Sequence, residues 1–357
     1  MKRQVCNRCI NDSTVRDIKF DKDGVCNYCR AYESISPKLH DYIRLGQLFK
    51  ERIEQAADKK YDYAAAVGFS GGKDSVYVLY KLVKEYGLKV KAFTLDNGFL
   101  SDEAYERIST VIAELGVEHE FVRFNEALLK KTYSYFTKKF LSPCIACSFL
   151  GYSAMIDFAS KINAAMCVHG RSIPQMLRSY LPHGKDVFIP YIESGLKPPS
   201  EIDLDKLFRN VLASTERYVD KRLAKEIKNT LMSNALEKGF REFVPFFLYH
   251  PYDKQEVIDY VIHNTSWRLG RDVEHFDCRI HNAARYLKNT VARRAHIMPD
   301  LSVSVREGTV SREEAMTECS ADIISCPHAE LDYMCDFMNI NKTKLLFKAR
   351  LYSKRWW

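Results

Sequence analysis

Short apolar runs alternate with longer segments of helical periodicity through the first half of the chain. Runs of strand length cover residues 63–69, 90–98, 118–123 and 162–168. Helical patterns with an apolar face cover 76–85 and 101–115, and an apolar helical stretch covers 149–160. Because parallel strands are joined through helical crossovers, this alternation predicts an α/β fold with a doubly wound parallel sheet.

The remaining pattern divides the chain into four segments. We expect a small metal ribbon over 1–32, a polar helical connector over 33–60, the α/β unit over 61–196 and a mainly helical region over 197–357 that contributes to the acceptor site. The third boundary coincides with Lys197-Pro-Pro-Ser200, a linker-like break. In the last segment, Asp253 is the expected N-cap of a helix, with Glu256 three residues later.

The composition of the 357 residues is that of an ordinary globular protein, with 46% hydrophobic and 28% charged residues. The net charge of +8 suits polyanionic ligands such as nucleotides, but no long basic run demands nucleic acid. The basic, aromatic tail over 348–357 is either a packed terminal helix or a docking segment. No apolar N-terminal signal or membrane-length span is present, so we expect a cytoplasmic protein without a membrane partner.

Eleven cysteines in such a chain favour metal binding or catalysis over disulfides. Four of them form two Cys-x-x-Cys pairs with sixteen residues between the pairs: Cys6, Cys9, Cys26 and Cys29. Between the pairs, residues 19–25 contain an Asp-Lys-Asp-Gly turn that predicts a hairpin. The spacing is that of a zinc ribbon, and four thiolates leave Zn²⁺ no open position, so a structural role is predicted.

A glycine-rich hexapeptide, Ser70-Gly71-Gly72-Lys73-Asp74-Ser75, lies between the first predicted strand and its helix. In that setting backbone N–H groups and the positive end of a helix dipole converge on one point, which favours a phosphate. Lys73 adds a positive charge. Asp74 would repel a bare phosphate, so it predicts a bridging Mg²⁺ ion. The stretch is not a Walker A loop, because Asp74 follows the lysine.

This hexapeptide resembles the PP-loop signature, SGGxDS, of the N-type ATP pyrophosphatases. Those enzymes cleave ATP between its α- and β-phosphates and adenylate an oxygen of a second substrate. The resemblance implies that residues 70–75 bind ATP, that Lys73 and Asp74 are catalytic, and that Asp96 of Asp96-Asn97-Gly98 contributes from the next strand end.

His169 and Arg171 follow the strand over 162–168, so they are expected at the carboxyl edge of the sheet, where α/β ligands bind. Arg171 is a candidate partner for a phosphate or an oxyanion. For His169, a contact with the nucleotide or acceptor and a simple loop histidine are equally compatible with the sequence.

A second cysteine set consists of Cys144 and Cys147, just before the apolar helical stretch, and the later Cys278. It resembles the cysteines of PP-loop sulfurtransferases that act on tRNA, which implies a [4Fe-4S] cluster with one iron open to sulfide. The pair is equally compatible with an ordinary helix N-terminus, a second zinc half-site or a redox dithiol.

Most of the chain also resembles the bacterial N-acetyl sugar amidotransferases. The likeness is carried by residues 6–12, 20–29, the PP-loop, and a segment from Arg293-Arg-Ala-His296 to Ala315. It implies conversion of an acetamido group on a nucleotide-linked sugar to an amidine, in the biosynthesis of lipopolysaccharide and other surface polysaccharides. Ammonia would come from a separate glutaminase subunit, because no recognisable glutaminase nucleophile is present. The alternative activity is thiolation of tRNA or a small molecule.

A basic helical face is predicted at His281, Arg285 and Lys288, which recur at i, i+4 and i+7. Such a face could hold the phosphates of a sugar nucleotide. A solvated basic helix explains the same pattern and is favoured by about two to one, as a rough prior on exposed charged faces.

Overall fold

The computed structural model describes residues 3–178, 206, 209, 213, 219–268 and 277–355. The linker-like Lys197-Pro-Pro-Ser200 lies outside the described residues, as do the last two residues of the tail. Within the described ranges, no helix combines the length and the apolar character that crossing a membrane requires.

Five parallel strands form the central sheet in the order β3-β2-β1-β4-β5. The chain therefore runs outward from β1 in one direction and then in the other, so the topological switch lies between β1 and β4. Their bounds are β1 Tyr63–Gly68, β2 Val90–Asp96, β3 Glu118–Arg123, β4 Ala164–His169 and β5 Glu242–Pro245. The predicted doubly wound parallel sheet is confirmed.

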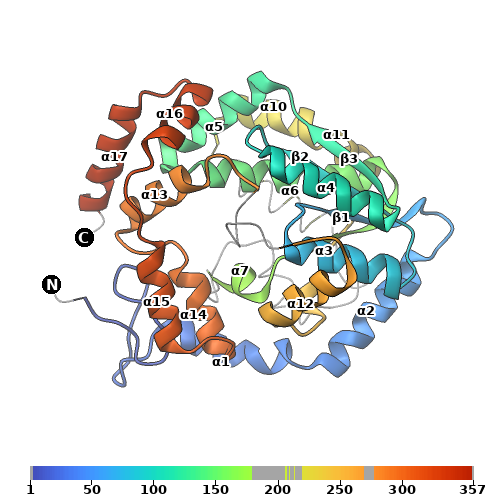
Figure 1. Cartoon of the computed structure of the whole chain (residues 1–357), viewed down its shortest axis with the longest axis horizontal. Helices are drawn as coiled ribbons and strands as arrows, with labels where there is room; N and C mark the ends of the chain where they lie inside the picture. Colours follow the sequence, from blue (N-terminus) through green and yellow to red (C-terminus); the bar gives the residue numbers. More distant parts are fainter. Residues whose placement is uncertain are drawn as a thin grey trace.

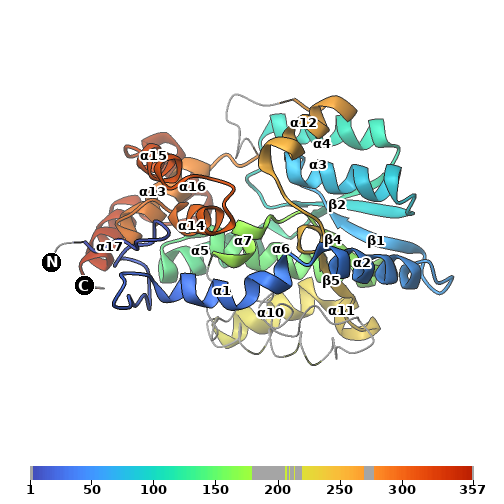
Figure 2. The same ribbon diagram turned by 90° about the horizontal axis from the view of Figure 1, so that it is seen from below.

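Helices cover both faces of this sheet (Figure 2). One face carries α3 (Lys73–Tyr80, continued by a π-helical turn over Lys81–Glu85), α4 (Asp102–Leu115) and α12 (Lys254–Asn264). The other carries α6 (Pro143–Lys161), α10 (Lys221–Leu231) and α11 (Ser233–Lys238), while α2 (Tyr42–Ala56) packs against β1 and β4. Short helix α7 (Ile173–Leu177) follows β4, and a 3₁₀ turn over Phe246–Leu248 follows β5.

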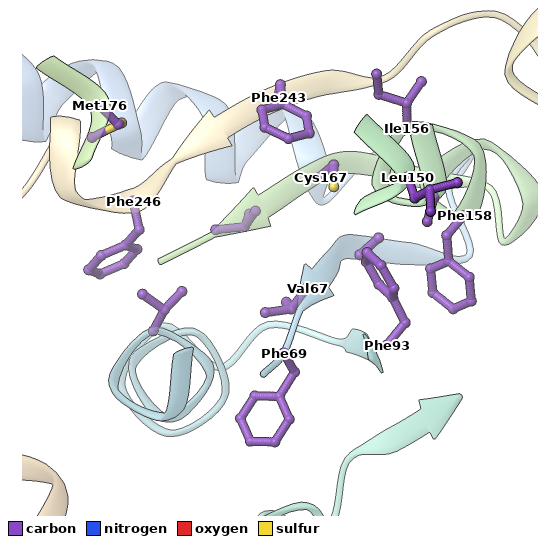
Figure 3. Packing of buried hydrophobic residues seen from close by; sticks show 14 of the residues in the cluster. Val67, Phe69, Phe93, Leu150, Ile156, Phe158, Cys167, Met176, Phe243 and Phe246 are labelled. Carbon is purple, nitrogen blue, oxygen red and sulfur yellow. The ribbon is translucent and has the colours of Figure 1, made fainter. Parts of the chain in front are cut away.

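Part of the core lies between the strands and α6 (Figure 3). Phe93 of β2 packs on Phe158 of α6 with ring centroids 4.6 Å apart, and both side chains are buried. Val67 and Cys167 lie on neighbouring strands and are fully buried. Buried β-branched, aromatic and small residues on both faces of β1 explain its continuous apolar pattern, since a parallel sheet is covered on both sides.

The C-terminal helices lie to one side of the sheet, next to the N-terminal segment (Figure 1). Among them, α14 (Met298–Glu307) packs on α7, and α16 (His328–Met338) packs on α5 (Glu126–Phe140). Helix α13 (His281–Ala292) packs on α17 (Lys342–Arg355). Helix α1 (Asn27–Leu39) leads from the N-terminal segment toward the sheet. Helix α15 (Arg312–Asp322) completes the C-terminal helices. A largely helical C-terminal part is confirmed.

A second, smaller core joins the two ends of the chain. The four cysteines, Ile10 and Val15 are buried against residues of α14 and α15, among them Leu301 and Ala315. Ser302 of α14 donates a hydrogen bond to Asn11 Oδ1 at 2.8 Å, and both residues are fully buried. The N-terminal cysteine segment and the C-terminal helices are therefore one packed unit.

Three local features refine the sequence expectations. Strand β5 was not foreseen; it lies beyond residue 196 and pairs with β4. Cys144 and Cys147 lie in the first turn of α6, rather than before the helix, because Ser142 and Pro143 begin it. The predicted cap is confirmed: Asp253 accepts hydrogen bonds from the backbone N–H groups of Gln255 and Glu256 at 2.8 and 2.9 Å.

Candidate nucleotide site and metal centre

The glycine-rich loop connects β1 to α3 at the carboxyl edge of the sheet. Gly71 has a positive φ of 74°, and Gly72 is the N-cap of α3. Side-chain hydroxyls satisfy two of the loop N–H groups: Ser70 N–H donates to Ser75 Oγ at 3.2 Å, and Gly72 N–H to Ser70 Oγ at 3.3 Å. In the part of the chain that the structure describes, the N–H groups of Gly71, Lys73 and Asp74 have no hydrogen-bond acceptor. Three free donors at the positive end of a helix can bind an anion.

Lys73 and Asp74 form an ion pair at the mouth of this loop. Lys73 Nζ lies 2.8 Å from Asp74 Oδ2, and the hydroxyl of Tyr252 donates to Asp74 Oδ1 at 3.2 Å. Burial raises the pKa of the Asp74 carboxyl, although Lys73 and Tyr252 favour its charged form. A phosphate or a divalent cation would compete with these partners, so the pair has to open for Lys73 to contact a phosphate.

The segment after β4 packs directly against the loop. Gly170 approaches it so closely that a Cβ atom there would lie 2.8 Å from the carbonyl oxygen of Asp74. His169 is buried beside it, its ring centroid 4.9 Å from that of Phe243, and its Nδ1 accepts a hydrogen bond from Arg171 N–H at 3.1 Å. Burial lowers the pKa of His169 to about 3. The structure thus brings His169 and Arg171 next to the loop, with His169 as a neutral imidazole.

Arg171 and Asp96 are both engaged by other protein groups. The Arg171 guanidinium donates to the hydroxyl of Tyr152 and, at 3.4 Å, to the carbonyl oxygen of Gln175. Asp96, at the end of β2, pairs with Arg123 Nε at 3.0 Å and accepts from Gly98 N–H at 3.2 Å. The Asp96 carboxylate therefore already stabilises the turn after its own strand.

Two aromatic residues at the loop were missed by the sequence reasoning. Trp267 is buried and donates its indole N–H to the carbonyl oxygen of Gly71 at 2.9 Å. Tyr252, in the turn before α12, binds Asp74 as described. Both come from the segment over 197–357, for which the sequence predicts a mainly helical region that contributes to the acceptor site, and no motif marks either of them. Only their packing against the loop identifies them.

The second cysteine set gathers beside the end of β2. Asn97 Nδ2 lies 3.5 Å from Cys147 Sγ, and Cys278 forms an antiparallel bridge with Leu100. Burial, reinforced by the charge of Cys144, raises the pKa of Cys147. Burial, reinforced by the charges of Cys147 and Cys144, likewise raises the pKa of Cys278. These three residues are neighbours. They are not, however, among the groups of described side chains that are close enough to hold a metal ion, so a cluster there stays a prediction.

The four N-terminal cysteines meet the geometry of a metal site. Their sulfur atoms all lie within 4.8 Å of one another, and all four residues are fully buried. Three Sγ–Sγ distances are 3.9, 3.7 and 3.6 Å, for Cys6–Cys29, Cys9–Cys26 and Cys26–Cys29. A tetrahedral ion with Zn–S bonds of about 2.3 Å requires sulfurs about 3.8 Å apart. The residues fit a four-coordinate thiolate site of zinc size, closed to a substrate.

Backbone and arginine donors surround these sulfurs. The N–H groups of Arg8 and Cys26 point to Cys6 Sγ at 3.4 and 3.2 Å. Arg306 of α14, largely buried, donates from Nε to Cys29 Sγ at 3.4 Å and from Nη2 to Cys9 Sγ at 3.6 Å. Hydrogen bonds from Cys26 and Cys29, aided by Arg306, lower the pKa of Cys9 to about 6. A thiolate is the form that binds metal, so Arg306 favours the metal-binding state.

The basic face of α13 is ion-paired at Arg285. Arg285 Nε lies 2.7 Å from Asp322 Oδ1, and the ring of His281 lies 6.5 Å from that of His296. Lys288 acts electrostatically on Asp300 of α14. The favoured interpretation of this face as a solvated helix is therefore wrong for Arg285, because Asp322 of α15 packs against it, and it stays a prediction for His281 and Lys288.

Comparison with known proteins gives distant likenesses only. No family model matches the chain, and no curated protein matches it. Among solved structures, it is similar to the U34-tRNA thiolase NcsA of Methanococcus maripaludis with its [4Fe-4S] cluster, at 15% identity and a TM-score of 0.39, covering 92% of each chain. It is also similar to an NH3-dependent NAD synthetase of Campylobacter jejuni, at 16% identity and a TM-score of 0.30, covering 57% of this chain and 99% of that one.

A third likeness is to the NMN synthetase of Francisella tularensis, at 14% identity and a TM-score of 0.28, covering 56% of this chain and 95% of that one. Identities and TM-scores this low assign no activity to this chain. Its function has to be argued from its own residues.

Proposed function

We propose that this protein adenylates an amide oxygen of an acceptor with ATP and releases pyrophosphate. The observation that carries the proposal is the loop over 70–75, with three free N–H donors and Lys73 at the positive end of α3. Such a cradle suits a polyphosphate chain. It lies at the carboxyl edge of the sheet beside the switch between β1 and β4, where open α/β sheets bind ligands.

In the proposed reaction the acceptor's amide oxygen attacks the α-phosphate, an O–P bond forms, and the bond to pyrophosphate breaks. Lys73 and the loop N–H groups stabilise charge on the phosphates, and Asp74 would hold Mg²⁺ once its pair with Lys73 opens. Arg171 contributes a further guanidinium beside the loop. Catalysis of this kind depends on positioning and on charge stabilisation more than on covalent chemistry.

Isothermal titration with ATP and Mg²⁺ and an assay of acceptor-dependent pyrophosphate release test this proposal. We expect Lys73→Ala together with Asp74→Ala to lower the release rate by about 10³-fold, since both act on developing charge. Lys60→Ala with Asp58→Ala is a matched control, because these exposed residues form an ion pair of the same type at 3.1 Å. Unchanged turnover in the double loop variant would contradict the assignment.

The proposed acceptor is a nucleotide-linked N-acetyl sugar, and the incoming nucleophile is ammonia from a separate glutaminase. Ammonia attacks the adenylated carbon, AMP leaves, and an amidinium group remains. The support is the sequence resemblance at the two ends of the chain. Residues 6–29 and 293–315, which carry that resemblance, pack together in one core, as segments of one functional unit would. Consumption of ammonia with formation of AMP, dependent on the sugar nucleotide and indifferent to tRNA, would support this acceptor.

Sulfur transfer is a second candidate function, favoured by one observation. Cys144, Cys147 and Cys278 lie together beside Asn97, at the edge of the sheet that also carries the loop. In this reaction the same adenylate forms, sulfide attacks the activated carbon, and AMP leaves with the former amide oxygen. A [4Fe-4S] cluster on these three cysteines would supply an open iron that holds the sulfide.

Anaerobic purification separates the two candidates. A brown protein whose colour is lost in Cys144→Ser, with sulfide-dependent AMP formation, would favour sulfur transfer. Cys335→Ser is the matched control, because Cys335 is a buried thiol of α16 outside both cysteine sets. A colourless protein that contains only zinc would exclude sulfur transfer through a cluster.

A further inference from the structure

A buried carboxylate fixes one histidine in the C-terminal helical part. Asp322, only 4% exposed at the end of α15, accepts from His296 Nδ1 at 2.9 Å and pairs with Arg285 Nε at 2.7 Å. The backbone N–H of His296 donates to the same carboxylate at 2.9 Å and to Asn289 Oδ1 at 2.8 Å. Burial opposes the charge on Asp322, but His296 and Arg285 outweigh it and lower the pKa of its carboxyl. An ionised Asp322 that only accepts hydrogen bonds requires the proton of His296 to be on Nδ1.

The other ring nitrogen of His296 is left as an acceptor. The side chain is 17% exposed, and Nε2 is neither buried nor hydrogen-bonded to any residue that the structure describes. A carboxylate that binds Nδ1–H of a histidine and leaves Nε2 bare and accessible is the arrangement that makes imidazole a general base. Structural histidines elsewhere in the chain differ: both ring nitrogens of His250 are hydrogen-bonded, to Phe246 O and to the hydroxyl of Tyr86.

Two separate series of neighbouring residues lie between His296 and the carboxyl edge of the sheet. Along the first, α14 packs on α7, Asp300 lies 3.8 Å from Arg178, and both His296 and Arg171 act electrostatically on Asp300. Along the second, the His296 ring lies 6.5 Å from that of His281, three residues after Cys278, which is bridged to Leu100. His296 therefore shares the neighbourhood of Asp300 with Arg171 and Arg178, which follow β4 at the carboxyl edge of the sheet.

We infer that His296, oriented by Asp322, is the general base that takes the N–H proton of the acceptor amide as the amide oxygen attacks the α-phosphate of ATP. This inference rests on the proposed function and deepens it. An amide oxygen that forms a bond to phosphorus leaves a protonated imidate unless its nitrogen loses the proton. Transfer of that proton to Nε2 leaves a neutral O-adenylated imidate and pyrophosphate, so atoms and charge balance. Any acceptor with an H–N–C=O unit has this requirement, whichever nucleophile follows.

Several charged groups on the surrounding elements lie near His296 itself or near Asp300, on which His296 acts electrostatically. They are Asp322 of α15, Asp300 of α14, His281, Arg285 and Lys288 of α13, and Arg171 and Arg178 beside α7. Arg285 and Asp322 neutralise one another at 2.7 Å. Asp300 Oδ1 is buried without a hydrogen bond from any described residue, close to where a proton would collect on His296.

The experiment measures pyrophosphate release by the full chain with ATP, Mg²⁺ and ammonium. The acceptor probes are UDP-N-acetylglucosamine, CMP-N-acetylneuraminate and unfractionated tRNA. His296→Asn is the main variant, because its amide can replace Nδ1–H as a donor to Asp322 but offers no base. We expect kcat to fall by about 10²-fold or more, with KM for ATP unchanged within about threefold. His328→Gln is the matched control, because His328 is an exposed histidine at the start of α16.

Rescue separates a base from a structural residue. Added imidazole should restore a substantial part of the rate of His296→Gly, and urea unfolding should show that both variants are folded. A wild-type kcat in His296→Asn, or a folded His296→Gly that imidazole leaves inactive, would overturn this inference but not the proposed function. Wild-type protein that releases no pyrophosphate with any of the three probes would overturn the proposed function, and the inference with it.

Discussion

The closest backbone approach in the candidate site occurs at Gly170, and the substitution Gly170→Ala tests it. The added Cβ would lie 2.8 Å from the carbonyl oxygen of Asp74, 2.9 Å from its carbonyl carbon and 3.2 Å from the backbone nitrogen of Ser75. Ordinary contacts begin near 3.4 Å, so the loop or the end of β4 would have to move by about 0.6 Å. The contacted atoms are backbone in the first turn of α3, and they cannot rotate away as a side chain would.

We expect two consequences of Gly170→Ala. Overpacking should lower the free energy of unfolding by about 1–3 kcal/mol. A loop displaced by a large fraction of an ångström should lower the rate of pyrophosphate release by about 10²-fold, because catalysis here depends on positioning. Urea unfolding measures the first effect, and ATP titration with the pyrophosphate assay measures the second.

Gly46→Ala is the matched control for Gly170→Ala. Gly46 lies inside α2, and a Cβ there would meet nothing within 4 Å. Alanine should stabilise that helix by about 1 kcal/mol and leave ATP binding unchanged. Wild-type stability and ATP affinity in Gly170→Ala would refute the close approach and, with it, the placement of the segment after β4 against the loop.

Three further predictions concern metal affinity, pH and a buried ion pair. Arg306→Met should weaken metal binding by about 10–100-fold in chelator competition, more than Arg306→Lys, because its hydrogen bonds to two sulfurs are lost. Burial lowers the pKa of His250 to about 4, so the unfolded chain binds more protons between about pH 6.5 and 4, and stability falls as pH falls. His250→Gln should reduce that slope by up to about 1.4 kcal/mol per pH unit near pH 5 in urea unfolding; an unchanged slope would contradict the neutral imidazole. Arg52 and Glu242 pair at 2.7 Å in the core, so Arg52→Met alone should cost about 3–5 kcal/mol, and adding Glu242→Leu should recover most of it in a double-mutant cycle.

The sequence predicts those strands whose own residues form an apolar run of strand length. The run over 63–69 is apolar because β1 is covered on both faces, and the predicted 118–123 strand matches β3. Strand β5 has only four residues, and it contains a glutamate and a proline. Its register with β4 and the burial of Glu242 beside Arg52 make it a strand. No local periodicity can reveal a strand that depends on partners so distant in the sequence.

The candidate site divides in the same way. The sequence predicts the loop over 70–75 and the four N-terminal cysteines as candidate sites, because their chemistry depends on the spacing of residues along the chain. Trp267, Tyr252 and Asp322 act on groups far away in the sequence, and none belongs to a recognisable motif. The basic face of α13 shows most clearly that the local sequence does not reveal partners from distant segments. Its helical periodicity is visible in the sequence, but Asp322, which pairs with Arg285, comes from α15, and Asp300, near Lys288, comes from α14.

Helix α14 connects the candidate metal site with the elements next to the candidate nucleotide site. One side of the helix holds the cysteine segment, through Arg306 to two sulfurs and Ser302 to Asn11. The other side packs on α7 and carries Asp300, which Arg178 and His296 face. An ion bound by four thiolates stabilises folding outright, so it would fix the register of α14. His296 lies two residues before α14, so that register would set where His296 lies relative to the strand ends. Under the proposed function, the metal unit would position the acceptor side of the site rather than take part in the reaction.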